Sequence, residues 1–144
     1  DRSRGLGDVY KRQVIDHIRS GGAMELYRLL HLDKLDCTVA IIKNAPSEVM
    51  GRKDIIKIDS TADIDLAVIG YVDPGATINV IRDGKLVEKR KLTMPERIVN
   101  VLRCKNPRCI TSVEPDLPQI FKLTSPETHT YRCIYCETKA EANQ

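Results

Sequence analysis

The stretch ATINVIRDGKLVEKRKL, residues 76–92, contains two runs in which apolar and polar side chains alternate, separated by Asp83-Gly84. Alternation with a period of two is typical of a half-buried β-strand. An Asp-Gly pair between two such runs is typical of a two-residue hairpin turn. The sequence therefore predicts an antiparallel hairpin at this point of the chain.

Short strand-like and helical patterns alternate on the N-terminal side of this hairpin. Strands are predicted for VIDHI (14–18), CTVAIIKN (37–44) and KDIIKID (53–59), and helices for GGAMELYRLLHL (21–32) and STADIDLAVIGYVDPG (60–75). This order predicts an α+β fold for residues 14–99: an antiparallel sheet with two helices on one face, a ferredoxin-like sandwich. Cys37, at the start of an apolar run, is expected to be a small core residue.

The composition suits a globular chain of one ordinary domain or two small ones, with 144 residues of which 42% are hydrophobic and 30% charged. No apolar run approaches the roughly 20 residues needed to span a bilayer, so no membrane partner is expected. Because no secretory signal is recognisable, we expect a cytoplasmic protein, in which thiols stay reduced.

The first residues of the chain differ in character from the rest. DVYKRQ, residues 8–13, is encoded by GATGTGTATAAGAGACAG, which resembles the end of a sequencing-library adapter. We therefore expect residues 1–13 to be a non-native leader; the alternative is a genuine flexible basic segment. The leader holds four basic and two acidic residues, so it supplies +2 of the net charge of +3. The nearly neutral remainder gives little support for nucleic-acid binding.

Four of the five cysteines form two close pairs, Cys104 with Cys109 and Cys133 with Cys136. Two tight turns that each present two thiolates are the usual way to surround a tetrahedral zinc ion. A thioredoxin-like redox role for CIYC, residues 133–136, would require a βαβ pattern around the motif, and the sequence shows none there. The spacing therefore predicts one structural zinc ion per chain, and four thiolates leave no position for a catalytic water.

Residues 100–144 are accordingly predicted to form a small all-β zinc-binding domain. Its strand-like segments are CITSVEP (109–115), IFKLTS (120–125) and THTYRC (128–133). These segments carry few apolar residues, so metal binding is expected to supply much of the folding free energy.

The first domain shows lysines on its predicted strands but no catalytic motif, since it has no P-loop, dinucleotide fingerprint or triad spacing. Lys53, Lys57 and Lys89 fall on alternating positions of adjacent runs. They are either solvated surface residues or an anion site whose ammonium groups converge on a phosphate chain. In the second case Asp16 and His17 would contact a sugar and Asn79 a base.

Several of these segments occur together and in order: VIDHI, MGRKDIIKI, ATINVI, PERIVNVLRC and the two cysteine pairs. As an ensemble they closely resemble the regulatory chain of aspartate carbamoyltransferase, from Val14 to the end. The resemblance implies a non-catalytic chain whose N-terminal domain, residues 14–99, binds ATP, CTP and UTP as allosteric effectors and forms a homodimer. It implies that the zinc domain, residues 100–144, docks on the catalytic chain of aspartate carbamoyltransferase, an enzyme of pyrimidine biosynthesis.

The resemblance also implies which residues bind the nucleotide. Asp16, His17 and Lys57 match ribose and phosphate contacts, and Lys89 matches a phosphate-binding lysine. The full implied set is Val14, Asp16, His17, Lys53, Lys57, Asn79, Ile81, Leu86 and Lys89. One departure is that family members have a further strand before VIDHI, where this chain has the suspected leader.

Two other classes of protein remain open. The cysteine spacing alone would also suit a zinc-ribbon nucleic-acid-binding protein, but acidic residues dilute its basic and aromatic side chains. A small zinc enzyme is the second alternative, and the closed four-thiolate site argues against it.

Overall fold

The computed structural model describes residues 11–60 and 62–141, which fall into two compact units. Unit 1 is Asp1–Thr93 and unit 2 is Met94–Gln144. The first ten residues of the suspected leader lie outside the described residues, whereas Lys11–Gln13 lie in the first strand. In the part of the chain that is described, no helix has both the length and the apolar character needed to cross a bilayer.

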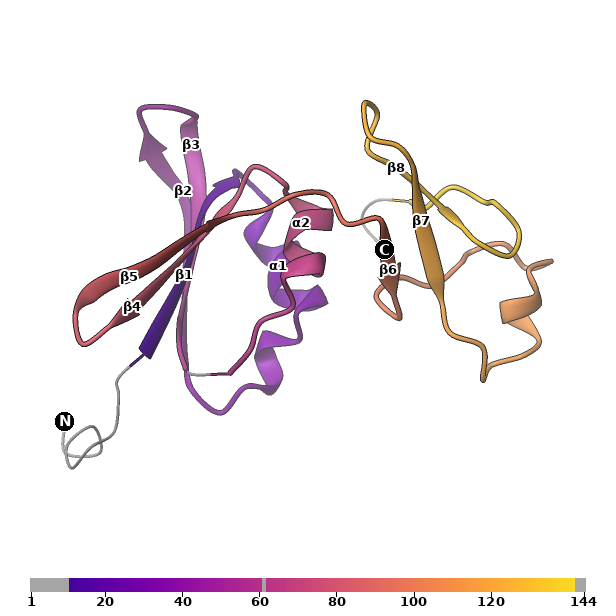
Figure 1. Cartoon of the computed structure of the whole chain (residues 1–144), viewed down its shortest axis with the longest axis horizontal. Helices are drawn as coiled ribbons and strands as arrows, with labels where there is room; N and C mark the ends of the chain where they lie inside the picture. The colour runs from indigo at the N-terminus through magenta and orange to yellow at the C-terminus, as the bar shows by residue number, and fades with distance from the viewer. Residues whose placement is uncertain (1–10, 61, 142–144) are drawn as a thin grey trace. The chain divides into compact units, whose positions relative to one another are not determined.

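Unit 1 is a five-stranded antiparallel sheet in the order β2-β3-β1-β4-β5. Its strands are β1 (Lys11–Arg19), β2 (Thr38–Ser47), β3 (Gly51–Asp59), β4 (Thr77–Arg82) and β5 (Lys85–Lys91). The helices α1 (Ala23–Leu29) and α2 (Leu66–Val72) lie together on one side of the sheet (Figure 1), and a short 3-10 helix η2 (Leu32–Lys34) follows α1. The predicted α+β sandwich with two helices on one face is confirmed.

The core of unit 1 lies between the sheet and the helices. Ile15, Ile56 and Ile78 of the sheet are buried together with Leu26 of α1 and Ile69 of α2. Burying one such side chain stabilises the fold by about 1.5–3 kcal/mol. Side chains alternate along a strand, so the residues directly before and after each of these isoleucines point to the opposite side of the sheet. We call that side, away from the helices, the outer face.

The hairpin predicted at Asp83-Gly84 joins β4 to β5. Both turn residues have positive φ, 50° for Asp83 and 80° for Gly84, as a type I′ turn requires. Cys37 packs, partly buried, against the core of unit 1, as expected from the apolar run that it begins.

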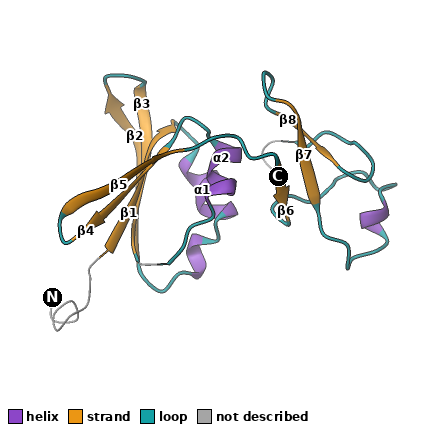
Figure 2. Cartoon of the chain, viewed as in Figure 1, coloured by secondary structure: helices purple, strands orange, loops and turns teal. Residues whose placement is uncertain are grey.

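Unit 2 contains a three-stranded antiparallel sheet of β6 (Arg97–Val99), β7 (Ile120–Ser125) and β8 (Thr130–Cys133). The prediction of a strand over residues 109–115 is wrong, because a 3-10 helix, η3 (Ile110–Ser112), follows the second cysteine (Figure 2). The Ser112 N–H donates to the Cys109 carbonyl at 2.9 Å, so the chain turns at once instead of extending. Phe121 and Tyr131 are the largest fully buried side chains of this unit.

Candidate functional site

The four paired cysteines of unit 2 converge on one point. The Sγ atoms of Cys104, Cys109, Cys133 and Cys136 all lie within 4.8 Å of one another. Cys104 and Cys136 Sγ are 3.5 Å apart, and Cys109 and Cys133 Sγ are 3.8 Å apart. An ion at the centre of four bonds of about 2.3 Å needs sulfur atoms about 3.8 Å apart. The cluster therefore fits a single tetrahedrally coordinated metal ion.

The turns that carry these cysteines are held by backbone hydrogen bonds. In the first turn the Cys109 N–H donates to the Asn106 carbonyl at 3.0 Å. In the second turn the Glu137 N–H donates to the Cys133 carbonyl at 2.9 Å, and Glu137 closes the turn with φ of 66°. Cys133 is the last residue of β8, so the second pair follows directly from a strand of the sheet.

Hydrogen bonds and burial act differently on the thiols of Cys104, Cys133 and Cys136. Burial, together with the neighbouring thiols, raises the pKa of Cys104 to about 12 and also raises the pKa of Cys133. Burial acts in the same direction on Cys136, but hydrogen bonds with Thr138 and Asn106 outweigh it and lower the pKa of Cys136 to about 6. A cation entering the site must therefore displace protons from the more basic thiols.

The outer face of unit 1 brings together residues from four strands. Lys57 of β3 pairs with Val14 of β1, Val14 pairs with Asn79 of β4, and Asn79 pairs with Lys89 of β5. Directly paired residues of antiparallel strands point to the same face. These four residues therefore form one cross-strand row, the outer row, in which two lysines flank a valine and an asparagine.

Asn79, within the outer row, has an unusual environment. Its Oδ1 atom is buried and is the one such side-chain atom without a hydrogen-bond partner among the described residues. A buried polar atom without a partner costs about 1–3 kcal/mol. Unsatisfied acceptors of this kind are rare in folded proteins and call for an explanation, such as a ligand donor.

A β-bulge adds two more polar groups to the same face. The pairing of β1 with β3 shifts between Ile15 and Ile18, and His17 has φ of 60°. Strict alternation would turn Ile18 outward, but the bulge keeps Ile18 fully buried. As a result His17 reaches the outer face, where its Nδ1 lies 3.1 Å from Thr77 Oγ1.

Asp16, the other residue of the bulge, forms an ion pair with Lys53, with 3.0 Å between Oδ1 and Nζ. Burial acts to raise the pKa of Asp16, but the Lys53 ammonium and the His17 N–H outweigh it, so this pKa lies below its usual value. Asp16 therefore stays a carboxylate at neutral pH. A carboxylate accepts hydrogen bonds from hydroxyl groups, such as those of a ribose.

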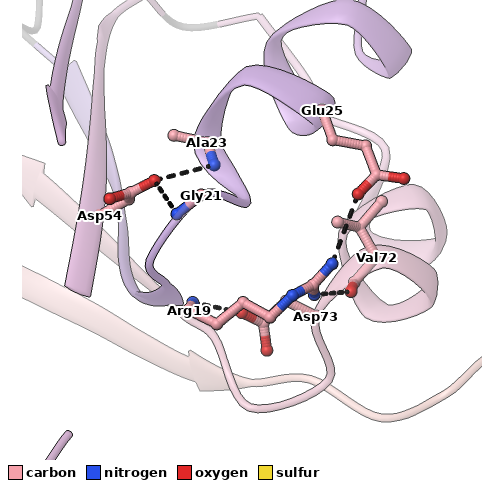
Figure 3. Close-up of polar contacts among 7 residues, drawn as sticks. All are labelled: Arg19, Gly21, Ala23, Glu25, Asp54, Val72 and Asp73. Carbon is pink, nitrogen blue, oxygen red and sulfur yellow. Dashed lines mark hydrogen bonds and ion pairs between the residues drawn. The ribbon is translucent and has the colours of Figure 1, made fainter. Parts of the chain in front are cut away.

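The end of β1 is anchored to both helices (Figure 3). Buried Asp54 accepts N–H groups from Gly21 at 3.0 Å and Ala23 at 3.1 Å, at the start of α1. Arg19 donates its N–H to Asp73 at 2.6 Å and its guanidinium to the Val72 carbonyl at 2.7 Å, at the end of α2. Since Asp54 follows Lys53 in β3, this network fixes the strand ends beside the bulge.

The predicted nucleotide residues thus lie on four adjacent strands of one sheet. Ile81 lies two residues closer to the hairpin turn than Asn79 and pairs with both Leu86 and Arg12. Leu86 and Lys89 are exposed. Sequence reasoning missed Thr77, which pairs with Asp16, and it excluded Arg12 with the suspected leader. Only the pairing register, which requires the long-range order of the strands, could have indicated either residue.

Two family profiles match consecutive parts of the chain. Residues 7–93 match the family described as "Aspartate carbamoyltransferase regulatory chain, allosteric domain", and residues 96–144 match "Aspartate carbamoyltransferase regulatory chain, metal binding domain". The outer row and the bulge lie in the first match, and the four cysteines lie in the second.

Similar full-length relatives carry the same description, "Aspartate carbamoyltransferase regulatory chain". The chain is 48% identical over 124 residues to that of Clostridium botulinum, covering 86% of this chain and 85% of the relative. It is 46% identical over 125 residues to that of Clostridium tetani, with 86% and 87% covered, and 44% identical over 128 residues to that of Bifidobacterium longum, with 89% and 92% covered. Relatives named as regulatory chains agree with the expectation that this chain is not an enzyme. The chain belongs to the aspartate carbamoyltransferase regulatory chain family.

Proposed function

We propose that this chain binds the nucleotides ATP, CTP and UTP on the outer face of unit 1 and passes feedback control of pyrimidine biosynthesis to aspartate carbamoyltransferase catalytic chains in the cytoplasm. The observation that carries the proposal is the outer row, in which Lys57 and Lys89 flank the unpaired Oδ1 of Asn79. A nucleoside triphosphate supplies an anionic end for ammonium groups and a base with hydrogen-bond donors. It therefore complements both features of the row.

Each part of the nucleotide has partners on this face. The triphosphate binds Lys57 and Lys89, because charge-assisted hydrogen bonds are the strong ones. The ribose hydroxyls donate to Asp16, with His17 and Lys53 beside it. The base lies against the partly apolar end of the site and donates to Asn79, and the lining residues there are Val14, Ile81 and Leu86.

The same acceptor explains how purine and pyrimidine effectors share one site. The exocyclic amino groups of adenine and cytosine and the N3–H of uracil are all donors. Asn79 Oδ1 accepts from any of them, since an amide oxygen has two lone pairs. The site therefore selects for a triphosphate strongly and for the base weakly.

The metal in unit 2 is proposed to be one structural zinc ion, held by Cys104, Cys109, Cys133 and Cys136. Soft thiolate ligands in tetrahedral geometry favour zinc over the hard cations magnesium and calcium. The zinc-bound unit 2 is proposed to dock on the catalytic chain, and unit 1 to pair with a second copy through its sheet. Allosteric control requires such a complex, because the effector and the substrate must bias the same two states.

Reconstitution tests this function directly. The zinc-loaded chain is mixed with catalytic chains of aspartate carbamoyltransferase, the complex is isolated, and its activity is measured at subsaturating aspartate with and without ATP, CTP and CTP plus UTP. We expect the activity to change with nucleotide in the complex and to stay unchanged in catalytic chains alone. A complex that forms but binds no nucleotide at millimolar concentration would refute the effector role.

A further inference from the structure

The chain passes from unit 1 to unit 2 through a very short linker. Leu92, directly after β5, packs partly buried against the core of unit 1. Pro95 belongs to unit 2, and Thr93 and Met94 are the two residues between them. Three extended residues span at most about 11 Å. A displacement of the end of β5 therefore acts on the start of unit 2 over a short stretch of chain.

The sequence of this linker also makes it stiff. The ring of Pro95 fixes its φ at about −65°. A residue before proline is restricted to extended conformations, and this restriction applies to Met94. Between Leu92 and Pro95, Thr93 alone keeps ordinary backbone freedom. A semi-rigid connection passes on a displacement that a flexible one would absorb.

Unit 2 holds its end of the linker with two hydrogen bonds, which we call the linker clamp. The Tyr131 hydroxyl donates to the Pro95 carbonyl at 2.6 Å, and the Leu123 N–H donates to the Glu96 carbonyl at 2.9 Å. Tyr131 and Leu123 are themselves directly paired between β8 and β7. Tyr131 is buried and precedes Cys133 by two residues in β8. The clamp therefore ties the linker to a strand that carries a cysteine of the metal cluster.

The other end of the linker leads back to the proposed nucleotide site. Lys89 precedes Leu92 by three residues, and β5 ends at Lys91, which pairs with Thr77 of β4. We propose that Tyr131 is a positioning residue for allosteric control. Its hydroxyl fixes the linker to unit 2, so that a shift of β5 on nucleotide binding is passed to β8. The inference rests on the function proposed above, because it concerns how the nucleotide acts on the regulated enzyme.

A purely structural role is the alternative, because the hydroxyl of a buried tyrosine usually needs a partner. Unit 2 contains a matched bond that separates the two roles: the Tyr135 hydroxyl donates to the Pro118 carbonyl at 2.9 Å. Tyr135 lies in the second cysteine turn, as close to the cluster in sequence as Tyr131. Both bonds join a tyrosine to a proline carbonyl within unit 2, but Pro118 lies outside the linker.

The test compares Tyr131→Phe with Tyr135→Phe in the complex of the full-length, zinc-loaded chain with catalytic chains. The coupling factor is the ratio of the aspartate concentrations that give the half-maximal rate with and without saturating nucleotide, measured for ATP and for CTP. We expect Tyr131→Phe to bring this factor closer to one by about two-fold or more, the effect of losing one neutral hydrogen bond. Tyr135→Phe should leave it unchanged, and zinc content and nucleotide affinity of the free chain should stay at wild-type values in both.

Pro95→Ala is a second variant, which keeps the carbonyl that accepts from Tyr131 but releases the fixed φ of the linker. It should also bring the coupling factor closer to one, and it decides the question if Tyr131→Phe fails to bind zinc. An unchanged coupling factor in zinc-loaded Tyr131→Phe or in Pro95→Ala would overturn the inference and leave the regulatory function intact. An equal loss in Tyr135→Phe would also overturn it, because the effect would then follow from the stability of unit 2. A wild-type complex whose rate does not respond to nucleotide would overturn the proposed function as well.

Discussion

Replacing Asn79 by leucine should make unit 1 more stable and a poorer nucleotide binder at the same time. The buried Oδ1 has no partner among the described residues, and such an atom costs about 1–3 kcal/mol. Because the rest of the side chain is only half-buried, we take the lower end, about 1 kcal/mol. Leucine has a similar shape and no polar atom to satisfy. For a domain of this size, a gain of about 1 kcal/mol raises the melting temperature by roughly 4–8 °C.

The same substitution removes the acceptor proposed for the base. A neutral hydrogen bond contributes about 0.5–1.5 kcal/mol net, so Asn79→Leu should lower the affinity for ATP and for CTP by about two- to ten-fold. Calorimetric unfolding of the full-length, zinc-loaded chain gives the stability, and nucleotide titration gives the affinity. The transition of unit 2 serves as an internal control and should not shift. A lower melting temperature of unit 1 with unchanged affinity would refute the assignment, because it would make Asn79 an ordinary structural residue.

Three further predictions follow from the two units. Lys57→Ala and Lys89→Ala should each lower the affinities for ATP and CTP alike by about ten-fold or more, since a hydrogen bond to a charged group contributes about 1.5–3 kcal/mol. An unchanged affinity in titration calorimetry would show that the substituted lysine is not part of the site. Cys109→Ser should abolish stoichiometric zinc and unfold unit 2 while unit 1 stays folded, as amide hydrogen exchange would show. Asp54→Ala should destabilise unit 1 by about 2–4 kcal/mol, because the backbone N–H groups of Gly21, Ala23 and Asn44 lose their acceptor. A decrease of less than about 1 kcal/mol in the free energy of unfolding, measured in urea, would contradict this prediction.

Local patterns predicted most of the fold because they were strong and mutually consistent. The Asp83-Gly84 turn needs two residues that tolerate positive φ, and few pairs other than Asp-Gly and Asn-Gly meet that need. The spacing of the two cysteine pairs predicted the four-thiol cluster in the same way, since few other sites use four cysteines at this spacing. Both signals are contained within a few residues and depend little on the rest of the chain.

Local patterns failed where a tertiary contact decides the conformation. The segment after Cys109 has β-branched residues, but the turn that presents the thiol continues into a 3-10 helix. The bulge at His17 is invisible to alternation, because only the burial of Ile18 in the core makes it favourable. The outer row likewise depends on strand order: Lys57 and Lys89 share it because β1 and β4 lie between them.

The outer face of unit 1 breaks several local rules at once, and this distinguishes it from an ordinary solvated surface. A histidine has positive φ, a carboxylate and an ammonium are partly buried as a pair, and an amide oxygen has no partner. Each of these features costs free energy in the unliganded domain, and of the three only the bulge at His17 also serves the core, by keeping Ile18 buried. Rules are broken together at functional sites, where a ligand returns the free energy. A polar face that existed only for solubility would carry exposed, satisfied groups on a regular strand, and a stabilising substitution there would leave nucleotide binding unchanged.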